Sequence, residues 1–346
     1  MQESSLLTLD TYRLLGNSGL RVSPLCLGTM TFGTDWNWGA DKDTCRKMFD
    51  LYLERGGNFI DTANLYTNGT SEEFVGEFLE GRRDEAVLAT KYTLSMRPND
   101  PNAAGNQRKN LQQALEASLK RLKTDHIDLY YVHAWDGITP IDEVMRALDD
   151  AVAAGKILYA GVSDFPAWKV AQANTLADMR GWSRFIGLQI QYSLVKRTVE
   201  RDLIPMAKDF NIGVLPWGAL AGGILTGKYE ETEKPDSGGR NVDDNLTERN
   251  RAIIKEIRAV AGEIERTPSQ VAHNWLLQRP GVTSIILGAR KLEQLEDNLA
   301  SLEFKLDDSQ IERLNDASAI EMGFPTDFLN LENIRKLVLG DVKIEM

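Results

Sequence analysis

Residues 127–162 read IDLYYVHAWDGITPIDEVMRALDDAVAAGKILYAGV, and this stretch holds the pattern that decides the fold. A short apolar run, Ile127–Val132, leads through a turn-rich connection into Pro140–Ala153, where apolar residues recur at helical spacing. A second apolar run, Ile157–Val162, follows. Because parallel strands need a long crossover connection, usually a helix, this stretch predicts a strand–helix–strand unit of a parallel sheet.

The same alternation extends in both directions along the chain. Helical spacing recurs in Thr44–Arg55, Asn110–Leu122 and Val199–Phe210. Eight apolar runs joined by such stretches favour an α/β fold, a (β/α)8 TIM barrel, and an open doubly wound sheet is the alternative. The remaining runs are Leu25–Leu27, Phe59–Ile60, Ala86–Thr90, Gly187–Ile190, Ile212–Leu215 and Ser284–Leu287.

Three segments depart from the repeat. Tyr12–Val22 is rich in turn residues and predicts an N-terminal β-hairpin. Residues 226–247 form a polar insertion after the seventh strand. The C-terminal tail has no strand signal but carries Phe324, Phe328 and Leu329, so we expect it to pack against the rest of the chain. No linker rich in proline, glycine or serine interrupts residues 1–346, which predicts a single domain.

Composition excludes several classes of protein. The chain has 346 residues, a net charge of −11 and 42% hydrophobic residues, which argues against a nucleic-acid or anionic-membrane surface. No signal peptide or membrane-spanning run is present, so a cytoplasmic location is expected. The two cysteines, Cys26 and Cys45, are expected to be buried and inert. With only three histidines and no His-Glu-x-x-His spacing, no metal site is predicted.

Polar residues stand where the predicted strands end. In a parallel barrel these ends form the working face of the molecule. Asp61, Lys91 and His133 close the second, third and fourth strands, and Tyr66 follows Asp61 on the next loop. Each residue alone also suits an ordinary structural role, such as a packed loop aromatic or a strand-end salt bridge. Ser163, Asp164, Gln189 and Gln191 close the next two strands.

These groups together suit protonation of an alkoxide. A free phenol has a pKa near 10 and donates a proton poorly at neutral pH. A buried ammonium, Lys91, is expected to lower the pKa of Tyr66, and Asp61 would keep that ammonium charged and oriented. His133 would hold a carbonyl oxygen near the phenol.

At this point the chain resembles a known family, the aldo-keto reductases. The motifs occur in the expected order, and the similarity runs from near Tyr12 to about Asn298. The resemblance implies NAD(P)-dependent carbonyl reduction, with Tyr66 as general acid and Asp61, Lys91 and His133 completing a tetrad. The motifs are Asn58-Phe-Ile-Asp61-Thr-Ala-Asn-Leu-Tyr66, Gly69-Thr-Ser-Glu-Glu73, Ala89-Thr-Lys91, Asp128-Leu-Tyr-Tyr-Val-His133 and Gly161-Val-Ser-Asp164-Phe165.

The resemblance also implies how the cofactor is held. Ser163, Asp164 and Gln189 match positions that hold the nicotinamide carboxamide, and Trp217 matches the aromatic that stacks on the ring. The insertion resembles a lid over the cofactor. Leu220, Gly222 and Lys228 match the segment around the pyrophosphate, and Gly288, Arg290, Lys291, Gln294, Asp297 and Asn298 match the adenosine end.

Two residues depart from the family pattern. Residue 164 is Asp where asparagine is usual, and a carboxylate accepts hydrogen bonds but cannot donate them. Gln294 stands where some members have an arginine for the 2′-phosphate, so that role falls to Arg290. We therefore expect NADP(H) as the cofactor; the alternative is that Arg290 is a solvated helix-start residue and NAD(H) is used.

Other functions are weighed against this one. A Rossmann dehydrogenase needs Gly-x-Gly-x-x-Gly, which does not occur. Gly222–Lys228 has part of a phosphate-loop pattern but lacks the following hydroxyl residue. A cofactor-binding redox-sensing subunit, as potassium-channel β subunits are within this family, stays open. A small-molecule carbonyl or alcohol is the expected partner, and the oligomeric state is unreadable. Substrate-pocket candidates are Trp36, Trp38, Trp135, Phe324 and Phe328.

Overall fold

The computed structural model describes residues 6–227, 247–340 and 342. Eight parallel strands form one sheet in the order β10-β3-β4-β5-β6-β7-β8-β9. The sheet closes into a barrel where β9 meets the segment that leads into β10. There the amide of Val214 donates to Gly281 O at 3.1 Å, and the amide of Thr283 donates to Val214 O at 2.8 Å. The strands are β3 (Leu25–Gly28), β4 (Phe59–Asp61), β5 (Val87–Tyr92), β6 (Ile127–Val132), β7 (Ile157–Ser163), β8 (Phe185–Gln191), β9 (Gly213–Trp217) and β10 (Ile285–Leu287).

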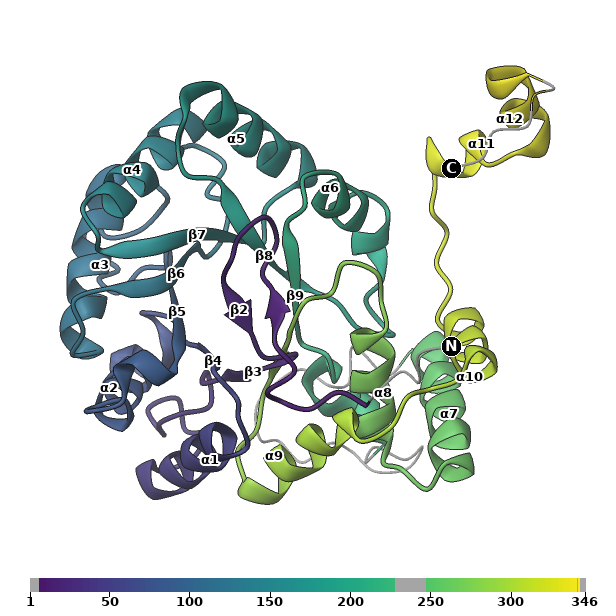
Figure 1. The fold of residues 1–346 in the computed structure, drawn as a ribbon, viewed down its shortest axis with the longest axis horizontal. Helices are drawn as coiled ribbons and strands as arrows, with labels where there is room; N and C mark the ends of the chain where they lie inside the picture. Colours follow the sequence, from purple (N-terminus) through teal and green to yellow (C-terminus); the bar gives the residue numbers. More distant parts are fainter. Residues whose placement is uncertain (1–5, 228–246, 341, 343–346) are drawn as a thin grey trace.

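This closure confirms the predicted barrel and rules out the open sheet. A ring of helices surrounds the strands in Figure 1. Six of the ten helices α1 to α10 begin at a side chain that accepts a backbone amide hydrogen bond; Thr267, for example, caps α8 with a reciprocal bond from Gln270. The helices are α1 (Lys42–Glu54), α2 (Thr70–Phe78), α3 (Arg108–Arg121), α4 (Ile141–Ala153), α5 (Ala167–Arg180), α6 (Leu203–Asp209), α7 (Glu248–Glu263), α8 (Pro268–Leu277), α9 (Leu292–Leu299) and α10 (Asp308–Ala317).

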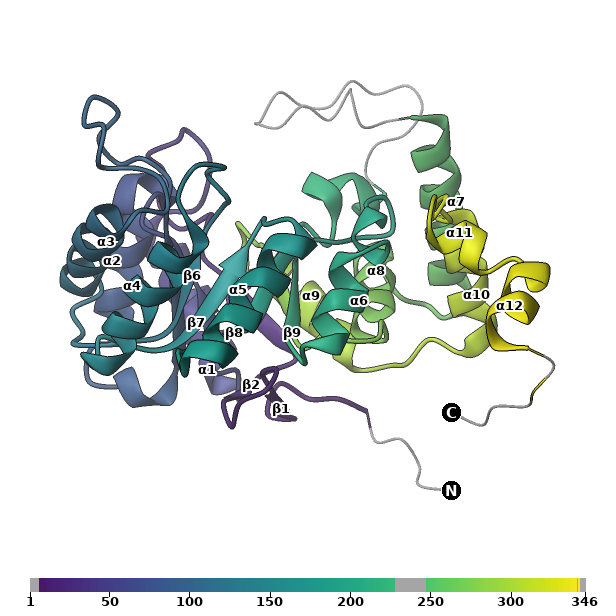
Figure 2. The same ribbon diagram turned by 90° about the horizontal axis from the view of Figure 1, so that it is seen from above.

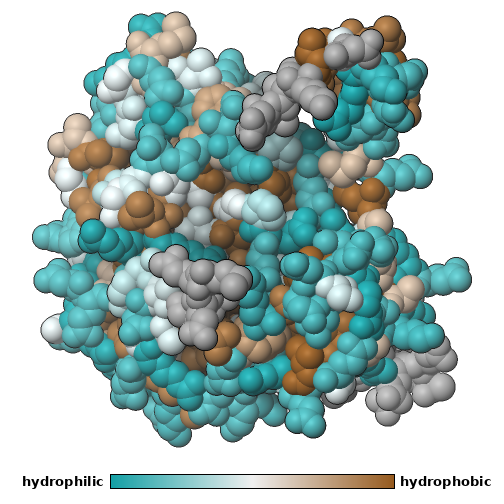
Figure 3. Space-filling view, turned by 45° about the vertical axis from the view of Figure 1, so that its right-hand side comes forward, coloured by the Kyte–Doolittle hydropathy of each residue, from teal (hydrophilic) through white to brown (hydrophobic). Residues whose placement is uncertain are grey.

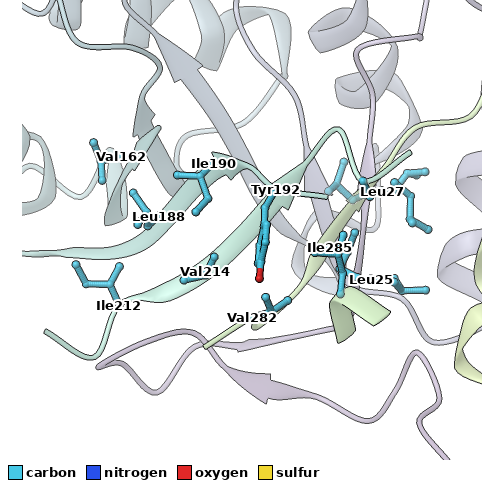
Figure 4. Close-up of a cluster of buried hydrophobic side chains, with 14 of the residues drawn as sticks. Leu25, Leu27, Val162, Leu188, Ile190, Tyr192, Ile212, Val214, Val282 and Ile285 are labelled. Atoms are coloured by element: carbon cyan, nitrogen blue, oxygen red, sulfur yellow. The ribbon is translucent and has the colours of Figure 1, made fainter. Parts of the chain in front are cut away.

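The strands separate two apolar cores. On β6, for example, Leu129 and Tyr131 belong to a core inside the barrel, whereas Tyr130 and Val132 belong to the larger core between strands and helices. This division follows from the alternation of side chains along a strand. Figure 4 shows part of the outer core, where Leu188 and Ile190 of β8 lie near Val162 and Val214.

The predicted hairpin closes the N-terminal end of the barrel. Its strands are β1 (Arg13–Leu14) and β2 (Arg21–Val22), and they lie below the barrel strands in Figure 2. Leu15 and Val22 are fully buried in the inner core, and the Arg13 guanidinium donates to Val282 O and Thr283 O at 3.2 and 3.3 Å. Access to the barrel interior from this end is therefore blocked by side chains.

The C-terminal tail contradicts the expectation that it packs against the barrel. Figure 1 shows α11 (Thr326–Leu329) and α12 (Glu332–Leu339) reaching away from the other helices, and in Figure 3 the lobe at upper right carries hydrophobic surface. Phe324 is 85% exposed and Phe328 is 46% exposed, so neither lines a pocket in the barrel. An apolar residue packs only where the fold presents an uncovered matching surface, which spacing along the chain does not reveal.

Two other expectations concern the rest of the chain. Most of the predicted polar insertion, residues 228–246, lies outside the described residues. Within the described part, no helix is long and apolar enough to span a bilayer. The same residues contain no group of three or more histidine, cysteine or acidic side chains arranged to hold a metal ion. Both cysteines are buried and free, as expected.

Candidate active site

The barrel gathers the predicted tetrad at the C-terminal ends of β4, β5 and β6. Lys91 lies at the centre and its side chain is fully buried. Its ammonium Nζ lies 2.6 Å from Asp61 Oδ2, 2.7 Å from the carbonyl oxygen of Thr62 and 3.1 Å from Tyr66 Oη. All three contacts lie within hydrogen-bond distance, so the ammonium links a carboxylate to a phenol in a water-poor environment.

Asp61 is held from two sides. While Oδ2 faces Lys91, Oδ1 accepts a hydrogen bond from Gln189 Nε2 at 2.8 Å. The sequence places Gln189 among residues expected to contact the cofactor, and its bond to the Asp61 carboxylate was not foreseen. This bond connects β8 to β4 across the barrel interior, a pairing that only the closed geometry creates.

A strained turn positions Tyr66. Tyr66–Gly69 forms η1, a short 3-10 segment in which Thr67 and Asn68 have φ values of 46° and 57°. The hydroxyl of Thr67 donates to Phe32 O at 2.6 Å, and the indole of Trp36 donates to Asn68 Oδ1 at 3.3 Å. These bonds tie the turn to the first βα loop and so offset the local strain.

His133 approaches Tyr66 edge-on. The two ring centroids are 5.9 Å apart, with an interplanar angle of 79°. Burial, aided by the charge of Lys91, lowers the pKa of His133 to about 3, so the imidazole is neutral at physiological pH. Its Nδ1 atom is buried and has no partner among the described residues. A neutral ring with an unused nitrogen can exchange a hydrogen bond with a small ligand.

The electrostatics of Tyr66 differ from the expectation. Burial raises the pKa of the phenol, and the Asp61 charge raises it further, although Lys91 opposes both effects. Burial, the largest single effect, acts to lower the pKa of Lys91, but Asp61 and Tyr66 together outweigh it and the net direction is upward. The prediction of a lowered Tyr66 pKa is therefore wrong, because desolvation and a nearby anion outweigh one cation.

A second group of side chains lies beside the tetrad, at the ends of β7 and β9. Ser163 Oγ is buried without a hydrogen-bond partner among the described residues. The indole Nε1 of Trp217 donates to Asp164 Oδ1 at 3.2 Å, a bond that was not foreseen either. An unsatisfied hydroxyl, a carboxylate and a half-buried indole suit a planar ring that carries an amide, so these residues fit a nicotinamide.

The predicted adenosine end lies at the N-terminus of α9. Gln294 Oε1 accepts from the amide of Arg290 at 2.9 Å and so ties the first turn of the helix to the residues before it. Asn298 donates to Gly288 O at 3.3 Å, and the Asp297 carboxylate accepts from Thr267 Oγ1 at 3.0 Å. Asn298 and Asp297 thus support the local fold, whereas the Arg290 side chain is exposed at the surface.

The segment after β9 is a loop that contains two glycines with positive φ values. Leu220 precedes η4 (Ala221–Thr226), in which Gly222 and Gly223 have φ values of 70° and 96°. Glycine adopts such angles without strain, and Gly222 is exposed, so a ligand can approach its backbone closely. Lys228, which the sequence assigned to the same segment, lies outside the described residues.

Four tryptophans lie on segments next to the tetrad of Asp61, Tyr66, Lys91 and His133. The rings of Trp36 and Trp38 lie 5.6 Å apart on the first βα loop. Trp135, directly after the His133–Ala134 pair, meets Trp168 of α5 edge-on at 5.7 Å. Trp168 is 59% exposed and was not among the predicted residues, since its position two residues after Pro166 suggested only a helix start. We call Trp36, Trp38, Trp135 and Trp168 the aromatic rim.

Comparisons with known proteins agree with this geometry. The chain is 39% identical to norsolorinic acid reductase of Aspergillus flavus, over 93% of this chain and 84% of the relative. It is 40% identical to aryl-alcohol dehydrogenase [NADP(+)] of Phanerodontia chrysosporium, over 90% and 87% of the two chains, and to an uncharacterized oxidoreductase of Bacillus subtilis, over 88% and 95%. The model of the aldo/keto reductase family matches residues 24–319. The chain therefore belongs to the aldo/keto reductase family, whose members are oxidoreductases that use a nicotinamide cofactor.

Proposed function

We propose that this protein catalyses the reversible, NADPH-dependent reduction of aromatic aldehydes and ketones, with Tyr66 as the general acid. The single observation that carries the proposal is the buried array of Asp61, Lys91 and Tyr66, with contacts of 2.6 and 3.1 Å from the lysine Nζ. A phenol whose hydroxyl touches a paired ammonium is suited to give up a proton as negative charge develops on a nearby oxygen.

The raised pKa of Tyr66 suits the reductive direction. It keeps the phenol protonated when substrate arrives, so the proton is present for donation. Once the proton has left, the Lys91 ammonium stabilises the phenolate, and Asp61 keeps that ammonium in place. The neutral imidazole of His133 would hold the carbonyl oxygen close to Tyr66. The cofactor, when bound, supplies the hydride, so that the C=O group gains one hydride and one proton.

Cofactor binding is assigned to residues around the tetrad. Ser163 and Asp164 would contact the carboxamide, and Trp217 would stack on the ring. Leu220, Gly222 and Lys228 would hold the pyrophosphate. At the α9 end, the exposed Arg290 beside the helix N-terminus is the choice for a 2′-phosphate, which favours NADPH over NADH. Gln294 would act by holding the Arg290 backbone, as its 2.9 Å bond supports.

The aromatic rim favours an aryl substrate. Trp36 and Trp38 lie on one side of the tetrad loop, to which Trp36 is bonded through Asn68. Trp135 follows His133 closely in the chain and is backed by Trp168. Indole faces favour planar aromatic ligands through offset stacking and edge-to-face contacts. The names of two relatives, aryl-alcohol dehydrogenase and norsolorinic acid reductase, support the same substrate class.

The test is a turnover assay at the reduced-nicotinamide absorbance band with 4-nitrobenzaldehyde, run with NADPH and with NADH. We expect faster consumption with NADPH, and we expect Tyr66→Phe to lower kcat by roughly two or more orders of magnitude with the Kd for NADPH nearly unchanged. The phenylalanine keeps the ring beside His133 and removes only the hydroxyl. Near-normal turnover in this variant would disprove Tyr66 as the acid, and no turnover despite cofactor binding would support the redox-sensing subunit instead.

A further inference from the structure

The titratable groups at the strand ends do not sum to zero charge. Lys91 and Asp61 form a buried ion pair of opposite charges at 2.6 Å. Tyr66, with its raised pKa, and His133, with a pKa of about 3, are both neutral at physiological pH. The remaining group is Asp164, a carboxylate. These five groups at the strand ends therefore carry a net charge of −1, and Asp164 is its source.

Asp164 has no compensating cation of its own. Within residues 6–227 and 247–340 its carboxylate forms no ion pair, and its hydrogen-bond donor is the neutral indole of Trp217, at 3.2 Å. Lys91 acts on the carboxylate only at a distance, since its ammonium is engaged by Asp61. Asp164 is also exposed, so a bound molecule can reach it.

A cationic ring at this place would be favoured over a neutral one. The bond to Trp217 places the Asp164 carboxylate beside the indole proposed to stack on the nicotinamide. The nicotinamide ring carries a positive charge when oxidised and none when reduced. Because a bound ligand displaces water from the exposed carboxylate, the charge–charge interaction strengthens on binding.

From this arrangement we infer that Asp164 makes the protein bind NADP+ more tightly, relative to NADPH, than a neutral side chain would. The inference rests on the proposed cofactor function. It adds to that function a residue that sets the relative affinity of the protein for the oxidised and the reduced cofactor. A carboxylate in contact distance of one cationic ring is expected to shift the ratio of the two dissociation constants by about tenfold, or about 1.4 kcal/mol. Because the oxidised cofactor is stabilised on the protein, the bound couple becomes a stronger hydride donor, and the equilibrium on the protein shifts toward carbonyl reduction relative to an otherwise identical chain with a neutral residue.

The test is Asp164→Asn, measured by binding without substrate. Asparagine has the same shape, keeps an oxygen that accepts from Trp217 and tolerates the φ of 49° at this position, so the fold is expected to survive. The dissociation constants of NADP+ and NADPH are measured by isothermal titration calorimetry on wild type and variant. The matched control is Asp178→Asn, which removes the same charge from the exposed outer surface of α5.

We expect the ratio Kd(NADPH)/Kd(NADP+) to fall about tenfold in Asp164→Asn and to stay unchanged in Asp178→Asn. An unchanged ratio in Asp164→Asn, whether both affinities stay or weaken equally, would overturn the inference and leave the proposed function intact. A similar fall in Asp178→Asn would also overturn it, because the effect would then come from total charge. Failure of wild type to bind either form would overturn the proposed function together with the inference.

Discussion

The two ends of the barrel are built from the same strands but serve opposite purposes. At the N-terminal end, Leu15 and Val22 of the hairpin segment complete the apolar core inside the barrel. At the C-terminal end, Asp61 and Lys91 are buried as an ion pair, and Ser163 Oγ is left without a partner. Apolar packing stabilises the fold, whereas the buried ion pair and the unpartnered Ser163 hydroxyl are polar groups that a ligand can contact. The comparison separates residues that hold the barrel together from residues proposed to do its chemistry.

The largest effect is expected from Lys91→Met, which removes the cation of the buried ion pair at the C-terminal end of the barrel. Removing the ammonium leaves Asp61 buried without its partner and takes the cation away from Tyr66. We expect kcat to fall by roughly two to four orders of magnitude and the free energy of unfolding to fall by about 3 kcal/mol. Steady-state kinetics and urea unfolding measure the two effects. Lys47→Met, at an exposed lysine of α1, is the control and should change neither. Wild-type turnover in Lys91→Met would contradict the comparison.

A change at the apolar end is expected to affect stability alone. Leu15→Ala removes a fully buried side chain from the inner core, so the free energy of unfolding should fall by about 2–5 kcal/mol while kcat of the folded protein stays within about twofold. Leu14→Ala is the matched control, because Leu14 is the preceding residue and is 59% exposed. If Leu15→Ala also lowered kcat of the folded protein by clearly more than about twofold, the apolar end would affect turnover as well as stability. The two ends could then not be assigned separate roles.

The smallest effect is expected in the tail, which belongs to neither end. Leu337 on α12 is 81% exposed, so Leu337→Asp should change the free energy of unfolding by no more than about 0.5 kcal/mol. Thermal unfolding and turnover with 4-nitrobenzaldehyde check this. A clear drop in either quantity would mean that the apolar surface of the tail is covered in solution.

Much of the fold follows from local pattern. The apolar runs that predicted eight strands fall on β3 to β10, because a strand buried on both faces is apolar at nearly every position. The meeting of Asp61, Lys91 and Tyr66 was also predictable, since adjacent parallel strands end at the same edge. The family motifs in the sequence were confirmed by the match over residues 24–319.

Other features depend on contacts between segments far apart in the chain. Gln189 bonds to Asp61 only because the barrel closes, whereas the indole of Trp217 at the end of β9 reaches Asp164 after β7 past the end of the intervening strand β8. The direction in which the Tyr66 pKa shifts follows mainly from how deeply the phenol is buried. The spacing of residues along the chain does not reveal that burial.

The sequence by itself determined the kind of barrel and the edge at which the proposed catalytic groups meet, because hydrophobic periodicity and strand direction are local properties. The tertiary structure alone decided which of these groups are charged, how Asp61 is oriented and where the tail lies. Those properties depend on burial and on partners distant in sequence, as Lys91, His133 and Phe324 each show.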